Sequence, residues 1–378
     1  MPLNRLIAAI VVHKDIKNFK LSPFVMRLNS KNKFYSAAIP ALSVMALGLA
    51  SCSNNDHDVN IEPSSNVIAF TATAPYAQQS RTVTTTESLN SFTVYGFVDG
   101  DVYMNDVKVN KTDNKWTYTP VQYWPLEKSV NFYSYSPENI TTQNPVNDME
   151  ENQTDIPGFI NNGTTDLLYG VNIGLSSATS KQVKVNFRHA LSQVRFLLKR
   201  RPGEMVDIHV SNVDLTGTCS IGSFSFPRET TSADNTIVGS WYNQNGVTDY
   251  QLFQGMEEID DDEAEEFLST GYMFAVPQVL ASTKDNDYSQ GAYLRVRCNM
   301  TDSRTGTLVW PSASATGYDP ASRTAFIYFP LATSEYNEWE TGRAYRYTLT
   351  LGVPGGQGAI DFDITVDEYP EFAQDDID

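Results

Sequence analysis

The 378-residue sequence has few of the side chains that enzymes and metal proteins most often use, with only four His and three Cys. It contains no His-Glu-x-x-His pair, no Gly-x-Ser-x-Gly turn, no phosphate-binding glycine loop and no zinc-type cysteine spacing. His13 and His57 lie near the N-terminus, which leaves His189 and His209. The sequence therefore predicts neither an enzyme nor a bound cofactor, although a distant pair of catalytic carboxylates has no sequence signature.

Basic residues are also scarce: 27 Lys and Arg stand against 45 Asp and Glu, a formal charge of −18. Residues 1–51 hold seven of the basic residues and one Asp, so the charge of the remaining chain is −24. A surface this acidic repels polyanions, and we expect no binding to nucleic acid through a basic patch.

Long hydrophobic runs are absent, since the most apolar segment, Ile39–Ala50, is far shorter than the roughly 20 residues that span a bilayer as a helix. It follows the basic residues Arg27, Lys31 and Lys33 and ends at Ser51-Cys52, as in a signal peptide. Residues 49–52, Leu-Ala-Ser-Cys, resemble a bacterial lipobox, which implies cleavage between Ser51 and Cys52, lipid on the Cys52 sulfur and delivery to the outer membrane. We expect residues 1–51 to be the signal, with Met26 as the true start, and residues 52–65 to be a lipidated flexible tether.

The other two cysteines are Cys219 and Cys298, and each shares the parity of apolar neighbours in a strand-like run. An exported protein experiences oxidising conditions, in which they could form a disulfide. Two buried thiols explain the same pattern. Both interpretations stay open.

Long amphipathic helical patterns are missing as well, and short runs rich in Val, Ile, Phe, Tyr and Thr recur between Gly, Pro, Asn and Asp clusters. This pattern predicts an all-β protein of antiparallel sandwiches. A break at Arg200-Arg201-Pro202-Gly203 predicts two domains, 66–201 and 202–378. The expected strands are 66–73, 92–98, 116–119, 129–134, 182–188, 192–199, 205–215, 272–276, 293–300, 323–329, 345–351 and 360–366.

Three polar segments stand out between these strands. Gln143–Asp166 is rich in Asn, Thr, Asp and Gly, and we expect an exposed insertion. Glu257–Glu266 holds eight carboxylates in ten positions, which favours a solvated loop over a calcium site because the alternating ligands and the glycine of such sites are missing. Asp285–Gly291 comes nearer to a calcium loop, but its glycine is one position late. No metal is therefore expected.

Six blocks, taken in order, resemble the fimbrillin-like lipoproteins of Bacteroidales. Each block is weakly specific, but together they cover nearly the whole of residues 66–370. The blocks are LNSFTVYGF at 89–97, WTYTPVQYWP at 116–125, VNFYSYSP at 130–137, FRHALSQVRF at 187–196, FAVPQ at 274–278 and WETGRAYRY at 339–347.

The resemblance implies two tandem transthyretin-like β-sandwiches in a fimbrial subunit that supports cell adhesion. It also implies maturation by a protease that cuts after an arginine between the first two strands. Loss of the first strand opens a groove, which a strand of a neighbouring subunit fills by β-strand addition. The implied partners are other fimbrial subunits, with the outer membrane reached through the lipid.

The chain contains segments suited to each step. Val67-Ile68-Ala69-Phe70 fits the removable strand, and the bond Arg81-Thr82 lies in a polar loop whose one basic residue is Arg81. Arg81 is equally interpretable as an ordinary surface arginine. The strictly alternating Ile360, Phe362, Ile364 and Val366 fit a donor strand, although the last strand of the chain's own domain is the favoured interpretation. An alternative function is a monomeric surface lipoprotein that binds a glycan or a host protein through loops such as Gln143–Asp166.

Overall fold

The computed structural model describes residues 66–74, 84–146, 149–232, 237–259, 265–266, 272–281, 291–352 and 361–369, with backbone only at 265–266 and 361–369. By its internal contacts the chain divides into two units, residues 1–60 and 61–378, and every described residue belongs to the second. The predicted signal peptide and tether, with Ser51 and Cys52, lie outside the described residues.

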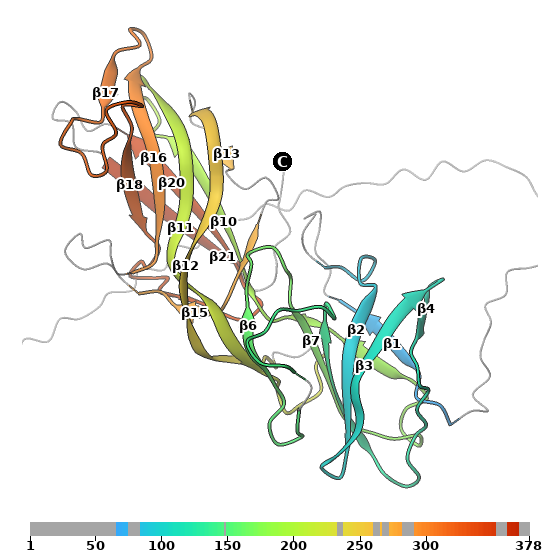
Figure 1. Ribbon diagram of the computed structural model, residues 1–378. Coiled ribbons are helices and arrows are strands. Elements are labelled where there is room, and N and C mark those ends of the chain that lie inside the picture. The colour runs from blue at the N-terminus through green and yellow to red at the C-terminus, as the bar shows by residue number, and fades with distance from the viewer. Residues whose placement is uncertain are drawn as a thin grey trace, which may run out of the picture. The chain divides into compact units, whose positions relative to one another are not determined.

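Every regular element in the described part of the chain is a β-strand, which confirms the all-β prediction. The first large sheet has the order β4-β3-β2-β5-β7-β9 and all its pairs are antiparallel (Figure 1). Its strands are β2 (Ser91–Val98), β3 (Asp101–Thr112), β4 (Lys115–Thr117), β5 (Val130–Ser136), β7 (Leu168–Leu175) and β9 (Arg188–His189).

A separate parallel pair joins β1 (Phe70–Thr73) to β8 (Val183–Asn186). Side chains of β1 and β8 share a core with one face of the first sheet, including Phe92 and Phe132. The other face of the same sheet, including Tyr95 and Tyr133, belongs to a different core that contains Phe224. The middle of this sheet is thus buried on both sides, and seven of the eight residues of β2 are buried.

The second half of the chain forms two more sheets that enclose one core, the arrangement of a β-sandwich. One sheet has β12, β11, β16 and β17 in order, with β18 on β16 and β6 on β11; the other has β13, β10, β20 and β21, with β14 on β10. Pair β10–β20 is parallel. A small pair joins β15 to β19. The strands are β6 (Asp155–Ile160), β10 (Ser192–Arg200), β11 (Val206–Ser225), β12 (Ser240–Ile259), β13 (Glu265–Glu266), β14 (Met273–Ala275), β15 (Gln278–Val279), β16 (Tyr293–Asp302), β17 (Leu308–Trp310), β18 (Ala325–Pro330), β19 (Glu338–Trp339), β20 (Ala344–Gly352) and β21 (Asp361–Tyr369).

The β11–β12 hairpin, 20 residues in each strand, links the cores of the two halves (Figure 1). The first part of β11 pairs with β16, and its last part pairs with β6. Accordingly, Leu215 belongs to the core of the sandwich, whereas Phe224 belongs to the core beside the first sheet. One hairpin therefore contributes apolar side chains to both.

Three features differ from the sequence-based expectations. Two strand pairs, β1–β8 and β10–β20, are parallel within an otherwise antiparallel fold. Gln143–Asp166 is not simply an exposed insertion, because it contains β6 and buries Ile156 and Phe159 against the first sheet. Strands β3, β7 and β12 also went unpredicted, since each is rich in Asp, Asn, Lys or Gly, or is mostly exposed.

The division into 66–201 and 202–378 stays a prediction. β10 precedes this boundary in sequence but pairs with β20 from the end of the chain. The backbone hydrogen bonds between β10 and β20 thus join the last residues before the boundary to the sandwich of the second half. Among the described residues no helix combines the length and apolar character needed to cross a membrane.

Gly217 lies between the two pairing regions of β11, where the register with β12 shifts. Its φ is +74°, and a Cβ there would lie 1.8 Å from the Gly291 carbonyl oxygen. We expect Gly217→Ala to lower the free energy of unfolding by at least about 2 kcal/mol, because strain adds to a backbone clash. Urea denaturation measures this loss.

Gly174→Ala is the matched control, since Gly174 has nearly the same φ, +70°, and nothing within 4 Å of an added Cβ. Gly174→Ala should lower the free energy of unfolding by about 1 kcal/mol, from backbone strain alone. Equal losses for the two variants would contradict the close contact between Gly217 and Gly291.

Candidate functional site

The candidate site is the N-terminal strand segment, residues 66–74, together with the two edges that hold it. Its first half pairs with residues 122–124: Ile68 N–H donates to Gln122 O (2.9 Å) and Trp124 N–H donates to Asn66 O (2.7 Å). Its second half pairs with β8, where Val183 N–H donates to Ala69 O and Phe187 N–H donates to Thr73 O, both at 2.8 Å. The segment is therefore bound to neighbours that lie more than 40 residues away in sequence.

Side chains of this segment alternate between core and surface, as expected of a half-buried strand. Ile68, Phe70 and Ala72 are 0%, 3% and 9% exposed, whereas Ala69 and Thr73 point outward. The predicted strand, Val67-Ile68-Ala69-Phe70, thus has its two large apolar side chains, Ile68 and Phe70, in the core, and the strand continues to Thr73.

Phe70 is the main anchor of the segment. Its ring makes edge-to-face contacts with Phe92, Tyr118 and Phe132, with centroid distances of 5.9, 5.5 and 5.7 Å. Aromatic pairs in this geometry stabilise a core beyond their buried area. The ring therefore links the segment to β2, to β5 and to the residues after β4.

Tyr118 holds the segment in a second way, because its hydroxyl donates to Ile68 O at 2.7 Å. Burial raises the pKa of Tyr118 above its ordinary value, which keeps the phenol protonated and able to donate. From the sequence, Tyr118 was expected only as part of the strand 116–119 and of a family-like block. Its hydrogen bond depends on tertiary structure and has no local signature.

Hydrogen bonds also hold the residues on either side of 75–83, the stretch between this segment and β2 that lies outside the described residues. Ala74 N–H donates to Thr86 Oγ1, whose hydroxyl lies 3.0 Å from Ala74 O. Thr84 N–H donates to Asp166 Oδ2 at 2.8 Å, and Asp166 Oδ1 lies 3.0 Å from Nδ1 of His189. Asp166 and His189 are both almost fully buried. Arg81 and Thr82, the predicted cleavage bond, lie outside the described residues, between these two anchor points.

The segment predicted to be a donor strand forms β21, which pairs with β20 along its whole length. Positions Phe362, Ile364 and Val366 lie opposite Leu351, Leu349 and Tyr347. Ile360 lies outside the described residues. Within the sheet order, β21 occupies the edge beside β20.

Cys219 and Cys298 are both free thiols. Cys298 lies opposite Val210 on β11, nine residues before Cys219, which corresponds to roughly 30 Å along a strand. A disulfide needs Cα atoms within about 7 Å, so the observed state is the unpaired alternative. Burial raises the pKa of the Cys298 thiol well above its ordinary value, which keeps it unreactive.

The remaining candidate residues are dispersed. Glu257 and Glu258 are exposed on β12, and the side chains of the rest of the acidic run lie outside the described residues, as does nearly all of Asp285–Gly291. His209 Nε2 lies 3.1 Å from Thr301 Oγ1 on the neighbouring strand. Among the described residues, no three His, Cys, Asp or Glu side chains are grouped as metal ligands.

A family model described as fimbrillin-like matches residues 79–368, which is most of the chain. The protein therefore belongs to the fimbrillin-like family, and the resemblance found in the sequence is confirmed.

Among similar solved structures, a fimbrial protein from Bacteroides vulgatus is 16% identical, covers 81% of this chain and 99% of its own, and has a TM-score of 0.53. The fimbrilin FimA from Porphyromonas gingivalis is 10% identical over 82% of this chain and all of its own, with a TM-score of 0.39. The fimbrial anchor protein Mfa2 of the same species is 10% identical over 79% of this chain and 96% of its own, with a TM-score of 0.32. No curated protein sequence matches the chain.

Phe70 provides a direct test of how firmly the N-terminal strand segment is held. We expect Phe70→Ala to lower the free energy of unfolding by about 3–5 kcal/mol, because it leaves a cavity among three aromatic rings. It should also speed hydrogen exchange of the Val183 and Phe187 amides, which bond to the segment. Urea denaturation and hydrogen exchange measure the two effects.

Thr71→Ala serves as the control, since Thr71 is in the same strand but is half-exposed and outside the core cluster. Thr71→Ala should lower the free energy of unfolding by less than about 1 kcal/mol. If both variants lost the same stability, Phe70 would not be the anchor.

Proposed function

We propose that this protein is a fimbrial subunit, exported as an outer-membrane lipoprotein and assembled by strand exchange. The observation that supports this proposal best is the N-terminal strand segment. It fills a place in the core with three inward side chains, yet in sequence only residues 75–83, part of the loop predicted from the sequence, connect it to Thr84 and β2. A cut in that loop leaves the segment held by non-covalent contacts alone.

The lipid on Cys52 serves as a delivery signal in this proposal. It carries the subunit to the outer membrane, and the acidic chain keeps the exported domain soluble near the surface. If the bond after Arg81 is cut, Cys52 and its lipid separate from the subunit together with residues 52–81. If the bond stays intact, Cys52 anchors the protein. Lipidated anchor subunits and delipidated shaft subunits thus follow from one structure.

The bond proposed to be cut lies between two residues that are held by hydrogen bonds, one on each side. Ala74 belongs to the departing side, whereas Thr84 stays bound to the buried Asp166. After cleavage, the new N-terminus therefore begins two residues before a held position. Release of the segment would expose Phe92, Phe132 and the free backbone edge of β8, and burial of comparable apolar side chains stabilises a protein by roughly 1.5–3 kcal/mol each. An unpaired edge and an apolar slot together favour capture of another strand.

β21 is the donor that we propose. It has nine residues, as many as the N-terminal strand segment, and its apolar residues alternate as Ile68, Phe70 and Ala72 do. A strand that replaced β1 would run parallel to β8, with alternate side chains entering the core. Because β21 pairs with β20 within its own chain, donation requires that it leaves this edge. The role is structural and non-enzymatic, and supports cell adhesion through the filament.

Arg81→Ala tests maturation. Filaments purified from cells that make the unaltered protein should contain subunits that begin at Thr82, and Arg81→Ala should yield uncut chains that retain Cys52 and stay out of filaments. N-terminal sequencing and immunogold electron microscopy measure this. Arg304→Ala, at an exposed arginine on the surface, should behave like the unaltered protein. Filament subunits that begin at Cys52 or Ser53 would overturn the cleavage.

Truncation tests the donor strand. A chain that ends at Gly358 lacks β21 and should be exported and cut but fail to polymerise, because it has no strand to give to its neighbour. A chain that ends at Tyr369 keeps β21 and should still form filaments. Circular dichroism of both truncated chains checks that each one folds. Filaments built from the shorter chain would rule out β21 as the donor.

A further inference from the structure

Two β-bulges lie opposite each other across one short stretch of β11. Between the pairs Ile221↔Asn245 and Ser223↔Tyr242, strand β12 has one more residue than β11. On the other side, between Gly222↔Phe159 and Phe224↔Ile156, strand β6 also has one more residue than β11. Bulges redirect side chains and concentrate near functional sites.

Each bulge contains a residue in the left-handed region. Asn243 in β12 has φ 54° and Gly158 in β6 has φ 63°. Asn and Gly are the residues that adopt this conformation most readily. The identity of the residues at 243 and 158 therefore favours a bulge at each position.

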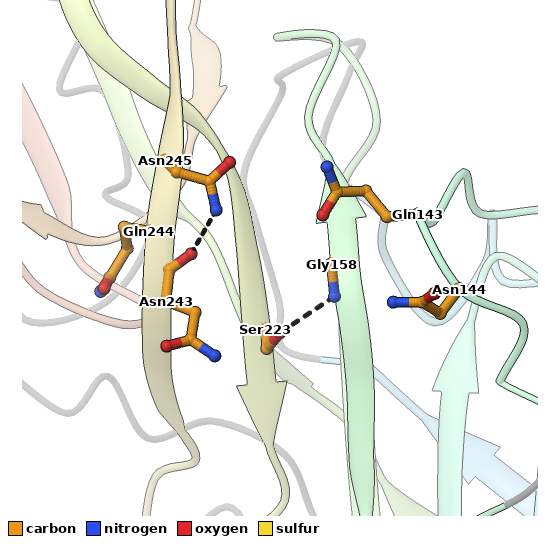
Figure 2. A pocket seen from close by; sticks show the side chains of 7 residues that line it. All are labelled: Gln143, Asn144, Gly158, Ser223, Asn243, Gln244 and Asn245. Carbon is orange, nitrogen blue, oxygen red and sulfur yellow. Dashed lines mark hydrogen bonds between the residues drawn. The ribbon is translucent and has the colours of Figure 1, made fainter.

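A hollow of about 440 Å³ lies at the level of these bulges, within the range of small-ligand sites. Figure 2 shows the amides of Asn243 and Asn245 on one side of Ser223 and the amide of Gln143 on the other. The hollow is lined by Gln143, Asn144, Gly158, Ser223, Asn243, Gln244 and Asn245.

The walls of the hollow are held by hydrogen bonds. Gly158 N–H donates to Ser223 Oγ at 3.0 Å, and Gln143 N–H donates to Gly158 O at 2.8 Å. The missing side chain of Gly158 lets Gln143 lie over it, since a Cβ there would be 2.9 Å from Gln143 Oε1. On β12, the side-chain amide of Asn245 donates to Asn243 O at 2.7 Å. The backbone around the hollow and the side-chain amide of Asn245 are thus held in place, while the amide of Gln244 donates to Pro277 O at 3.3 Å.

The chemistry of the lining is uniform: five amides and one hydroxyl, with no charged side chain. An amide offers one acceptor oxygen and two donor hydrogens, which matches the mixed donor and acceptor character of sugar hydroxyls. An ionic ligand would lack a counter-charge, and the acidic chain repels anions. An apolar ligand would leave these amides without partners.

Tyr242 adds an aromatic side chain next to the hollow. It precedes Asn243, lies opposite Ser223 in register and is 36% exposed. Its hydroxyl donates to Asp155 Oδ2 at 2.8 Å, which fixes the ring. An amphipathic ring of this kind offers contact area at low entropic cost.

We propose that this hollow is a binding site for a neutral saccharide, held by the amides of Gln143, Asn243 and Asn245. The site lies on β6, β11, β12 and the residues before β6, and shares no residue with the N-terminal strand segment or with its partners at 122–124 and on β8, so we expect binding without filament assembly. It would give the protein a glycan-recognition function in addition to its proposed role as a subunit.

The experiment titrates the purified full-length exported chain with linear neutral hexasaccharides of glucose, mannose and galactose, and with a hexasaccharide of galacturonic acid. Isothermal calorimetry should detect micromolar to millimolar binding of at least one neutral probe, and weaker binding of the acidic one. Asn243→Gly and Gln143→Ala should each weaken binding by about tenfold or more, because each removes an amide from the site. The affinity should stay constant between about pH 5 and 8, since no lining side chain titrates there.

Two controls separate binding from folding. Glycine keeps the left-handed backbone of position 243, so Asn243→Gly should unfold at the same urea concentration as the unaltered protein. Gln254→Ala removes an exposed amide from β12 outside the hollow and should bind as the unaltered protein does. The proposal is overturned if no neutral hexasaccharide binds, if the acidic probe binds more tightly, or if the hollow variants bind as tightly as Gln254→Ala.

Discussion

Burial of one sheet on both faces is the constraint on which the rest of this structure depends. Strands β2 and β5 send Phe92 and Phe132 toward β1 and β8, and Tyr95 and Tyr133 toward the core that β6 and β11 share. Each face needs its own cover, because an apolar sheet face exposed to water is unstable. The first cover is a short segment near the N-terminus, and the second is built into the long hairpin. Loss of the N-terminal strand segment would therefore leave the second cover in place, which is what the proposed strand exchange requires.

The sequence predicted the parts of this arrangement that local patterns determine. Short runs of β-branched and aromatic residues between turn residues located β2, β5, β10, β16 and β20 to within a few residues. It did not reveal β12, whose side chains are mostly polar and exposed, because this strand exists through its pairing with β11. The parallel direction of β1 relative to β8 was also hidden, since strand direction depends on topology.

The two candidate sites differ in how far the sequence could reveal them. The N-terminal strand segment has a periodic pattern, but the hydrogen bond from Tyr118 to Ile68 and the edge at Gln122–Trp124 join residues about 50 positions apart. The amide hollow has no sequence signature. It arises because Asn243 and Gly158 form bulges on opposite sides of β11, and the coincidence of two bulges is visible only once the register is known. The expectation that Gln143–Asp166 is exposed was wrong for β6 and right for Gln143 and Asn144.

The strand exchange proposed above also has an energetic requirement that these contacts define. In its own chain β21 lies in an antiparallel ladder with β20, whereas in place of β1 it would lie in a parallel ladder with β8. Parallel pairing is slightly less stable per residue, so backbone bonds alone do not favour the exchange. The driving force must come from apolar side chains that enter the positions of Ile68, Phe70 and Ala72. The proposed cleavage after Arg81 would make these positions available, because it would leave the N-terminal strand segment bound by non-covalent contacts alone.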